Sequence, residues 1–230
     1  PLFHMHGMGV GLHGTLLVGS SAILQDGFQV EEVIQAINTH QTSMFFGVPT
    51  MYHRLARHPH VQEMTKMRLC VSGSAPLASS LHRKLNEVAG IEVLERYGMT
   101  ETVMLVSNPY LGERRSGTVG FPLPGVKMKV EEQSGEILVS GPNVFEGYWN
   151  QLSTNQEAFV DESTERWFRT GDLGKLDEDG FLKIIGRKKE LIISGGYNVY
   201  PREVDDVLIN HPAIEQVAVA GLSSEEWGEE

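Results

Sequence analysis

The chain has 230 residues, of which 40% are hydrophobic and 21% are charged, a composition typical of one large or two smaller globular domains. Its formal net charge of -11 argues against a duplex-DNA binder, because neutralising phosphates requires clusters of Lys and Arg. No apolar run approaches the roughly 20 residues that a transmembrane helix needs. A single cysteine, Cys70, excludes an internal disulfide, and its apolar neighbours predict a buried thiol in a reducing compartment.

Apolar residues recur at helical spacing in three segments of the first half of the chain. Residues 30–37 form the first segment, and a second helix is expected to open at Thr50 and to continue to Ala56. Apolar residues spaced by four, four and three positions predict a third helix over residues 77–88, which Gly90 ends.

Short apolar runs between these helices predict strands. Residues 44–48 and 69–71 are apolar, and residues 91–94 precede a polar loop. Because strands that alternate with helices form parallel sheets, residues 1–115 are expected to form an α/β subdomain. Residues 1–4 predict the end of an apolar strand.

Residues 116–186 are richer in turn signals and predict a small antiparallel β-subdomain. Residues 135–140 form a short apolar strand. Residues 173–176 and 181–185 flank an Asp-Glu-Asp-Gly turn, in which Gly180 supplies the positive φ that a hairpin requires.

The pattern changes again past this hairpin. An apolar run at residues 191–193 is broken by a Gly-Gly pair, Pro201 then opens a helix, and residues 214–220 predict a strand. We therefore place a domain boundary near residues 187–189 and expect residues 187–230 to begin a small α+β domain.

Four Gly-rich, polar segments are candidates for chemistry, although each alone is also consistent with a turn. They are Ser72–Pro76, Tyr97–Thr102, Arg169–Asp172 and Gly186–Glu190. The first two follow predicted strands. Because ligand clefts of open α/β sheets lie at the carboxyl ends of strands, their positions favour a functional role.

The residues of these segments suit a nucleotide. Small residues in the first segment let the backbone approach a flat ring. Tyr97 offers a face for stacking, Thr100 a hydroxyl for a phosphate, and Glu101 a carboxylate for Mg²⁺. Asp172 could accept both ribose hydroxyls, and Arg187 could meet phosphate or ribose oxygens. Taken alone, Asp172 is better explained as a turn residue, and Arg187 equally well as a solvated cation.

Patterns of other enzyme classes are weak. His4, His6 and His13 lack the nearby Cys or acidic residues that would complete a zinc site, so a ring lining a cleft is the better interpretation of His4. Residues 9–14 match Gly-x-Gly-x-x-Gly, but too few residues precede them for the strand that a dinucleotide site requires, and a helix start explains them. No Gly-x-Ser-x-Gly hydrolase motif is present.

Six segments, in order, resemble successive core motifs of the acyl-CoA synthetase, adenylation-domain and luciferase superfamily. They are residues 1–7, 72–77, 97–101, 135–149, 169–172 and 186–201. The resemblance covers nearly the whole chain. It implies a ligase that first joins a carboxylic acid to the α-phosphate of ATP, releasing pyrophosphate. The ligase then transfers the acyl group from AMP to a thiol, usually that of coenzyme A.

The resemblance also implies roles for residues of the two strand-end segments. Ser74, Ala75 and Tyr97 would border adenine. Thr100 would meet a phosphate, and Glu101 would hold Mg²⁺.

Further roles follow from the same resemblance. Asp172 would take the ribose hydroxyls with help from Arg187, and His4 would lie near the acyl group. Lys189 matches the hinge about which a small C-terminal domain rotates, and Gly195 and Gly196 match the segment that borders the pantetheine tunnel. The rotation has a physical reason, because one pocket must first exclude water and then admit a thiol.

Two elements of the superfamily are expected outside this sequence: a phosphate loop before Pro1 and a catalytic lysine after Glu230. Residues 1–186 would then be the C-terminal part of the large AMP-binding domain, and residues 187–230 the start of the mobile domain. We expect the parent protein to be the ligase and this piece alone to be inactive. A cytoplasmic location is expected, or the mitochondrial matrix if a targeting segment precedes Pro1.

The substrate is expected to be malonate or a related short dicarboxylate. The segments around Arg54 and Arg96 are similar to those of malonyl-CoA synthetases, in which the matching arginines meet the free carboxylate. A second carboxylate entering a dry pocket needs a cationic partner, and Arg can bind it bidentately. Two alternatives stay open: a medium- or long-chain fatty-acyl-CoA ligase, and a remnant that binds AMP or an acyl-adenylate without turnover.

Overall fold

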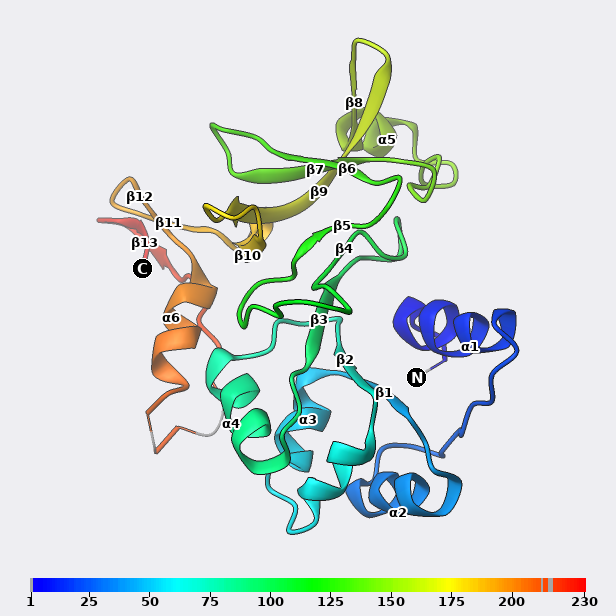
Figure 1. Ribbon diagram of the computed structural model, residues 1–230. Coiled ribbons are helices and arrows are strands. Elements are labelled where there is room, and N and C mark those ends of the chain that lie inside the picture. Colours follow the sequence, from blue (N-terminus) through cyan, green and yellow to red (C-terminus); the bar gives the residue numbers. More distant parts are fainter. Residues whose placement is uncertain (1, 212, 215–216) are drawn as a thin grey trace. The chain divides into compact units, whose positions relative to one another are not determined.

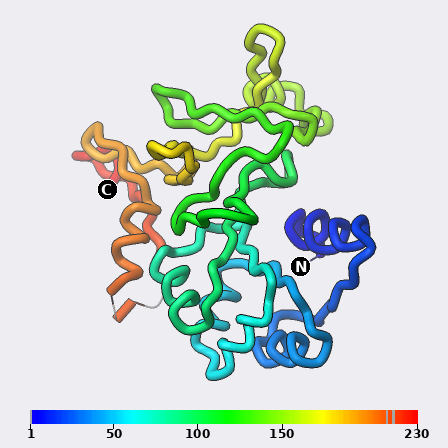
Figure 2. The backbone as a smooth tube through the Cα atoms, in the orientation of Figure 1, coloured from blue at the N-terminus to red at the C-terminus, as the bar shows by residue number. Residues whose placement is uncertain are grey.

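The computed structural model describes residues 2–211, 213–214 and 217–230. The chain divides into two compact units, and its path can be followed in Figure 2. Unit 1 comprises Pro1–Gly125 and Pro142–Phe145, and unit 2 comprises Val126–Gly141 and Glu146–Glu230. The boundary expected near residues 187–189 falls within unit 2 and stays a prediction about the domains.

A five-stranded sheet in the order β1-β2-β3-β4-β5 forms the centre of unit 1. The strands are β1 (Met44–Gly47), β2 (Leu69–Ser72), β3 (Leu94–Tyr97), β4 (Val106–Ser107) and β5 (Phe121–Pro122). The first three are parallel, as predicted, and the last two pairings are antiparallel. Strand β3 begins at Leu94 rather than Ile91, because its pairing with β2 begins opposite Val71. Tyr97 is therefore the last strand residue and not the first loop residue.

Helices cover one face of this sheet, as Figure 1 shows for α2, α3 and α4. They are α2 (Val30–His40), α3 (Pro49–Leu55) and α4 (Ser79–Ala89), with the 3₁₀ helix η2 (Val61–Lys66) between the last two. Ile37, Leu55 and Leu85 are buried in one cluster with Cys70 of β2. Burying each large aliphatic side chain stabilises the fold by about 1.5–3 kcal/mol. The helix at residues 77–88 starts two residues later than predicted, and Gly90 ends it with φ +60°.

Successive strand residues point to opposite faces, so a second cluster lies on the other side of the sheet. It contains Leu69, Val71 and Leu94, with Phe46 packed against them. The chain start supplies the π-helix η1 (His6–His13) and the short helix α1 (Gly14–Leu17). The strand expected at residues 1–4 is wrong for the described residues 2–4, which form a turn that leads directly into this helix.

Unit 2 is built on an antiparallel sheet in the order β10-β9-β7-β6, with β8 paired to β9. The strands are β6 (Lys127–Val130), β7 (Glu136–Ser140), β8 (Phe159–Glu162), β9 (Glu165–Leu176) and β10 (Leu182–Arg187). The predicted hairpin is confirmed, with Gly180 at φ +85° in its turn. A short helix that the sequence did not reveal, α5 (Leu152–Ala158), precedes β8.

The end of unit 2 consists of small elements after the 3₁₀ turn η3 (Lys188–Glu190). They are β11 (Ile192–Ser194), β12 (Tyr197–Val199), α6 (Pro201–Leu208), β13 (Ser223–Ser224) and β14 (Gly228–Glu229). Of the strand predicted at residues 214–220, positions 215–216 lie outside the described residues, and positions 214 and 217–220 form no strand. A strand needs a neighbour in a sheet, and the described residues of this segment have none.

No helix among the described residues is long and apolar enough to traverse a bilayer.

Candidate functional site

The loop after β2 lies at the carboxyl end of the parallel strands of unit 1, and a buried carboxylate holds it. Glu95 of β3 accepts a hydrogen bond from the Leu77 N–H on one oxygen and from the Gly117 N–H on the other, both at 3.3 Å. Ser74, in the same loop, adopts φ +67°, a conformation uncommon outside glycine. Glu95 was not among the predicted site residues, and its position directly after the apolar run that ends at Leu94 was the signal for it.

The loop after Tyr97 folds tightly back on itself. A Cβ atom on Gly98 would lie 2.2 Å from the Val103 carbonyl oxygen, so only glycine fits there. Val103 itself has φ +60°, which is strained for a β-branched residue. The Asn143 amide donates to the carbonyls of Thr102 and Met104 at 2.8 and 3.0 Å, which braces the loop. Such strain persists only where the surroundings enforce it, and it concentrates at functional sites.

A cationic corner lies on the same side of the sheet as the second apolar cluster. The Arg96 guanidinium sits 5.8 Å from the centre of the Phe46 ring, and the His6 ring meets Phe46 edge-on at 6.1 Å. The Ser74 hydroxyl oxygen lies 3.5 Å from His6 Nδ1. We call His6, Phe46, Ser74 and Arg96 the Arg96 cluster. It joins the predicted adenine loop to the predicted acid site.

Polar atoms of the Arg96 cluster are left unsatisfied. Within the described part of the chain, Arg96 Nε and His6 Nε2 are buried and have no hydrogen-bond partner. Burial lowers the pKa of Arg96. Burial, followed by the charge of Arg96, lowers the pKa of His6, which favours a neutral ring beside a guanidinium cation. This arrangement can accept an anion that brings its own oxygen atoms.

The other residues predicted to meet the acid have different surroundings. The Arg54 guanidinium lies 5.9 Å from the centre of the Phe28 ring, so the two arginines sit over different rings. His4 packs on Phe3, with ring centres 4.5 Å apart. Their roles toward an acid stay predictions.

In unit 2, the structure brings together the two residues predicted to bind ribose. Asp172 of β9 and Arg187 of β10 face each other in the strand register, with Arg187 Nε 3.3 Å from Asp172 Oδ1. Asp172 is buried, and its N–H donates to the Thr170 hydroxyl at 3.1 Å. Thr170 in turn donates to the Ile137 carbonyl at 2.8 Å. A register shift between β7 and β9 produces a bulge here, a feature common beside active sites.

Behind this pair lies Glu136, which the sequence analysis did not single out. Its carboxylate accepts hydrogen bonds from Arg169 Nη1 at 2.8 Å, Lys188 Nζ at 3.2 Å and the Gly171 N–H at 3.3 Å. Arg169 also donates to Glu131 at 3.3 Å. We call Glu131, Glu136, Arg169 and Lys188 the Glu136 cluster. Burial alone would lower the pKa of Arg169, but hydrogen bonds to and charges of Glu136 and Glu131 outweigh it, so the pKa is raised.

The residues predicted for the hinge and the thiol tunnel lie further along unit 2. Lys189 is exposed within the turn η3. Gly195 and Gly196 form the turn between β11 and β12 with φ +56° and +82°, and a Cβ on Gly195 would lie 2.6 Å from the Trp227 ring. The geometry explains the glycines as turn residues, and their roles toward a thiol stay predictions.

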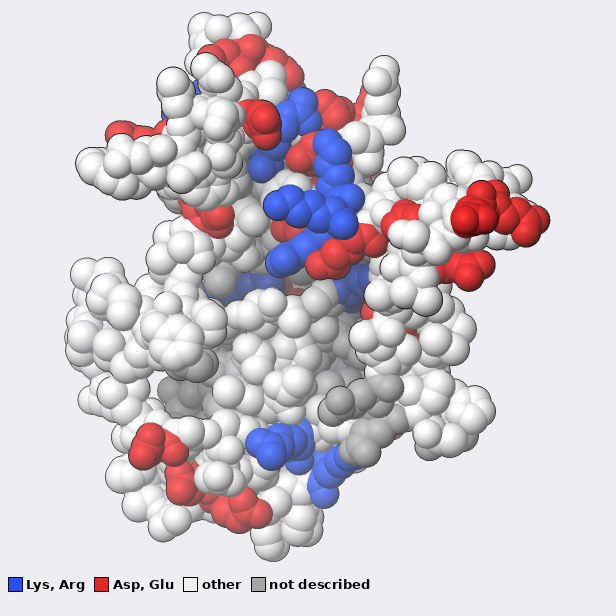
Figure 3. All heavy atoms as spheres, turned by 180° about the vertical axis from the view of Figure 1, so that it is seen from behind, with Lys and Arg blue, Asp and Glu red and all other residues white. Residues whose placement is uncertain are grey.

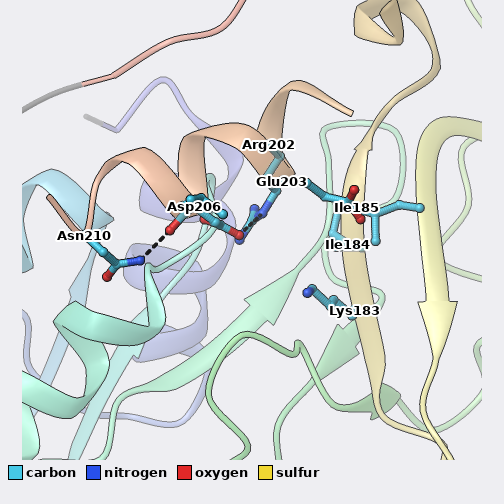
Figure 4. A pocket seen from close by; sticks show the side chains of 8 residues that line it. Lys183, Ile184, Ile185, Arg202, Glu203, Asp206 and Asn210 are labelled. Carbon is cyan, nitrogen blue, oxygen red and sulfur yellow. Dashed lines mark hydrogen bonds and ion pairs between the residues drawn. The ribbon is translucent and has the colours of Figure 1, made fainter. Parts of the chain in front are cut away.

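A pocket between β10 and α6 contains none of the predicted site residues. Figure 4 shows its lining side chains, among them Lys183, Arg202 and Asp206, with Arg202 Nε 3.4 Å from Asp206 Oδ2.

On the face in Figure 3, basic and acidic side chains adjoin one another. Among the described residues, no three His, Cys, Asp or Glu side chains gather as a metal would require.

Comparison with known proteins identifies the relatives of this chain. The AMP-binding enzyme family matches residues 1–149. A long-chain-fatty-acid–CoA ligase from Bacillus subtilis is 34% identical over 242 residues, and a malonate–CoA ligase from Arabidopsis thaliana is 36% identical over 256 residues. Each match covers 100% of this chain and 42% of the relative. The chain therefore spans less than half the length of these relatives.

Solved structures resemble the chain over its whole length. The ATP-bound MatB from Rhodopseudomonas palustris matches with a TM-score of 0.93 and 41% identity, covering 100% of this chain and 47% of that chain. The o-succinylbenzoate CoA synthetase from Bacillus subtilis, with its acyl-adenylate intermediate, matches with a TM-score of 0.84 and 35% identity, covering 100% and 48%. These likenesses confirm the predicted fold class of mixed parallel and antiparallel sheets.

Proposed function

Because this chain belongs to the AMP-binding enzyme family, we propose that the protein is an ATP-dependent acid–CoA ligase that acts through an acyl-adenylate. The observation that carries this proposal is that relatives aligned to 99–100% of the chain are CoA ligases for several different acids. The acid, ATP and coenzyme A are then the substrates. The shared chemistry lies in the activation of a carboxylate, and the acid differs from relative to relative.

The strand ends of unit 1 are proposed to hold the base and phosphates of the nucleotide. Ser74, Ala75 and Tyr97 border adenine, Thr100 meets a phosphate, and Glu101 holds Mg²⁺. The tight loop that Gly98 permits and Asn143 braces supports this proposal, because a preorganised loop loses little entropy on binding. One carboxylate plus phosphate oxygens is a ligand set that Mg²⁺ accepts.

Unit 2 is proposed to supply the ribose contacts, the hinge and the start of the mobile domain. Asp172 accepts the ribose hydroxyls, and Arg187 assists it. Lys189 is the hinge of a mobile domain that begins near residue 187, and the Gly195–Gly196 turn borders the thiol path. The exposed position of Lys189 in a single 3₁₀ turn supports the hinge, because hinges are short loop or element-end positions that absorb a backbone rotation.

The acid is proposed to be malonate or a related short dicarboxylate. The half-buried Arg96, with an unsatisfied Nε and beside it a His6 whose pKa burial and the Arg96 charge lower, supports a second carboxylate as the missing partner. A bidentate carboxylate would satisfy the guanidinium and offset the cost of its burial. An aliphatic acyl chain would leave the same cation unpaired.

A substrate comparison tests this proposal. In the complete protein, Arg96→Ala is expected to lower kcat/KM for malonate by about 100-fold, as expected for loss of a bidentate ion pair, and to lower it much less for octanoate. Arg68→Ala is the matched control, because Arg68 also lies over an aromatic ring of unit 1, at 5.7 Å from Tyr110. Equal losses with malonate and octanoate would reject the dicarboxylate.

A fatty-acyl-CoA ligase is the second candidate, favoured by the Bacillus subtilis relative that acts on long-chain fatty acids. Higher kcat/KM for octanoate than for malonate in the unmodified protein would establish it. A remnant without turnover would bind AMP but release no pyrophosphate with any acid. A pyrophosphate assay on the complete protein therefore separates all three functions.

A further inference from the structure

The Glu136 carboxylate contacts both sides of the Asp172–Arg187 pair. One of its oxygens accepts the N–H of Gly171, the residue before Asp172. Its other oxygen accepts the ammonium of Lys188, the residue after Arg187. Each strand that carries a member of the pair is therefore tied to one carboxylate at the adjacent position.

The Glu136 carboxylate is the least exposed charged group of the Glu136 cluster. The exposed fraction of its side chain is 3%, against 27% for Arg169 and 55% for Lys188. A buried carboxylate is tolerated only where charges and hydrogen bonds compensate it, and here two cations and one backbone N–H do so. The compensating groups leave Glu136 little freedom to turn away, so its position is well defined.

The local backbone explains why such an anchor is needed. Glu136 pairs with Leu173 and Leu138 with Arg169, so residues 170–172 bulge out of the ladder between β7 and β9, while Asp172 stays in register with Arg187 on β10. Gly171 adopts φ +72° in this bulge. A bulged segment loses part of its hydrogen bonding to the neighbouring strand, here β7. The bond from the Gly171 N–H to Glu136 therefore helps to fix the direction of the next residue, Asp172.

We propose that Glu136 is the positioning residue of the nucleotide site, holding Asp172 and Arg187 so that the Asp172 carboxylate faces a ribose diol. This inference rests on the proposed function, because it assigns the pair to the ribose of a bound nucleotide. Glu136 touches no ligand itself. It acts through the Gly171 amide on β9 and through the Lys188 ammonium in η3, directly after β10.

The test measures discrimination between AMP and 2′,3′-dideoxy-AMP, by calorimetry, in the complete protein. Two hydroxyls bound by a fixed carboxylate should make AMP bind about tenfold or more tightly than the dideoxy nucleotide. Glu136→Gln preserves the shape but removes the charge that anchors Lys188 and Arg169. We expect this ratio to fall to about twofold in Glu136→Gln, because a misdirected Asp172 loses the hydroxyl contacts.

Glu131→Gln is the matched control. Glu131 also binds Arg169 and lies within reach of the Lys188 charge, but among the described residues it makes no hydrogen bond or ion pair with Gly171 or Lys188. The AMP preference of Glu131→Gln should therefore stay close to that of the unmodified protein. An unchanged ratio in Glu136→Gln overturns the inference, and so does an equal fall in both variants. Melting temperatures taken alongside show whether each variant is folded.

A milder variant keeps the test decisive if Glu136→Gln does not fold. Lys188→Met removes the exposed cation and frees only the Arg187 side, so the ratio should fall about half as far on a logarithmic scale. A ratio unchanged in Lys188→Met then overturns the inference. Failure of the unmodified protein to bind AMP would instead reject the proposed function itself.

Discussion

The Arg96 cluster of unit 1 and the Glu136 cluster of unit 2 place charges in contrasting environments. Arg96 is half-buried over the Phe46 ring, and no ion pair to it is found in the described part of the chain. Two buried nitrogens of its cluster, Arg96 Nε and His6 Nε2, have no hydrogen-bond partner among the described residues. In the Glu136 cluster, the buried carboxylate meets two cations and a backbone N–H within 3.3 Å.

The difference is one of charge compensation: the Glu136 cluster pairs its charges within the described residues, and the Arg96 cluster leaves buried nitrogens without a hydrogen-bond partner. A half-buried cation without an ion pair costs free energy that the Phe46 ring offsets in part and that a bound anion would offset further. A paired cluster contributes to the fold before any ligand binds, and it fixes the geometry of its neighbours. The first arrangement agrees with the proposed role of Arg96 toward a carboxylate, and the second with the proposed role of Glu136 in positioning Asp172.

The largest expected effect comes from breaking the paired cluster. Arg169→Met should lower the free energy of unfolding by about 2 kcal/mol, less than for a fully buried pair because Arg169 is 27% exposed and Lys188 remains. Denaturant unfolding of the unmodified protein and the variant measures the change. Arg115→Met is the control, since its carboxylate partner Glu113 is 63% exposed, and a loss as large there would show that Arg169 is not special.

Removing the charge of the Arg96 cluster is expected to change the free energy of unfolding in the opposite direction. Arg96→Met removes a charge that burial disfavours, so the free energy of unfolding should rise by about 1 kcal/mol in the absence of ligand. The same denaturant experiment measures it. A destabilisation comparable to that of Arg169→Met would mean that Arg96 is structurally paired, and the contrast between the clusters would disappear.

The smallest expected effect is on the pH dependence of stability, through the buried and uncharged thiol of Cys70. Burial raises the pKa of the Cys70 thiol from 9.0 to about 12. The folded protein keeps this proton while the unfolded chain loses it, so the thiol's contribution is full below pH 9 and declines above it. Cys70→Ala should therefore cost about 0.8 kcal/mol less at pH 9.5 than at pH 7, as measured by unfolding at both values. A cost independent of pH would show that Cys70 titrates normally when folded.

Local patterns were predicted well because they depend on neighbours in the sequence. Helical spacing at residues 30–37 produced α2, and Gly180 produced the hairpin turn between β9 and β10. Predictions failed where a segment needed a distant partner. Residues 2–4 and the described part of 214–220 are not strands, because a strand depends on the sheet beside it.

The sequence by itself determined the family, the fold class and the segments that could carry chemistry, because each motif is a short run of residues. Only the tertiary structure decided which charges are paired. Arg96 meets His6 across 90 positions of sequence, and Glu136 meets Lys188 across 52, so chain folding alone sets these distances. An acidic residue in an apolar strand, such as Glu136 in β7, indicates that a compensating cation lies nearby. Which cation it binds depends on how the strands pair in the folded chain.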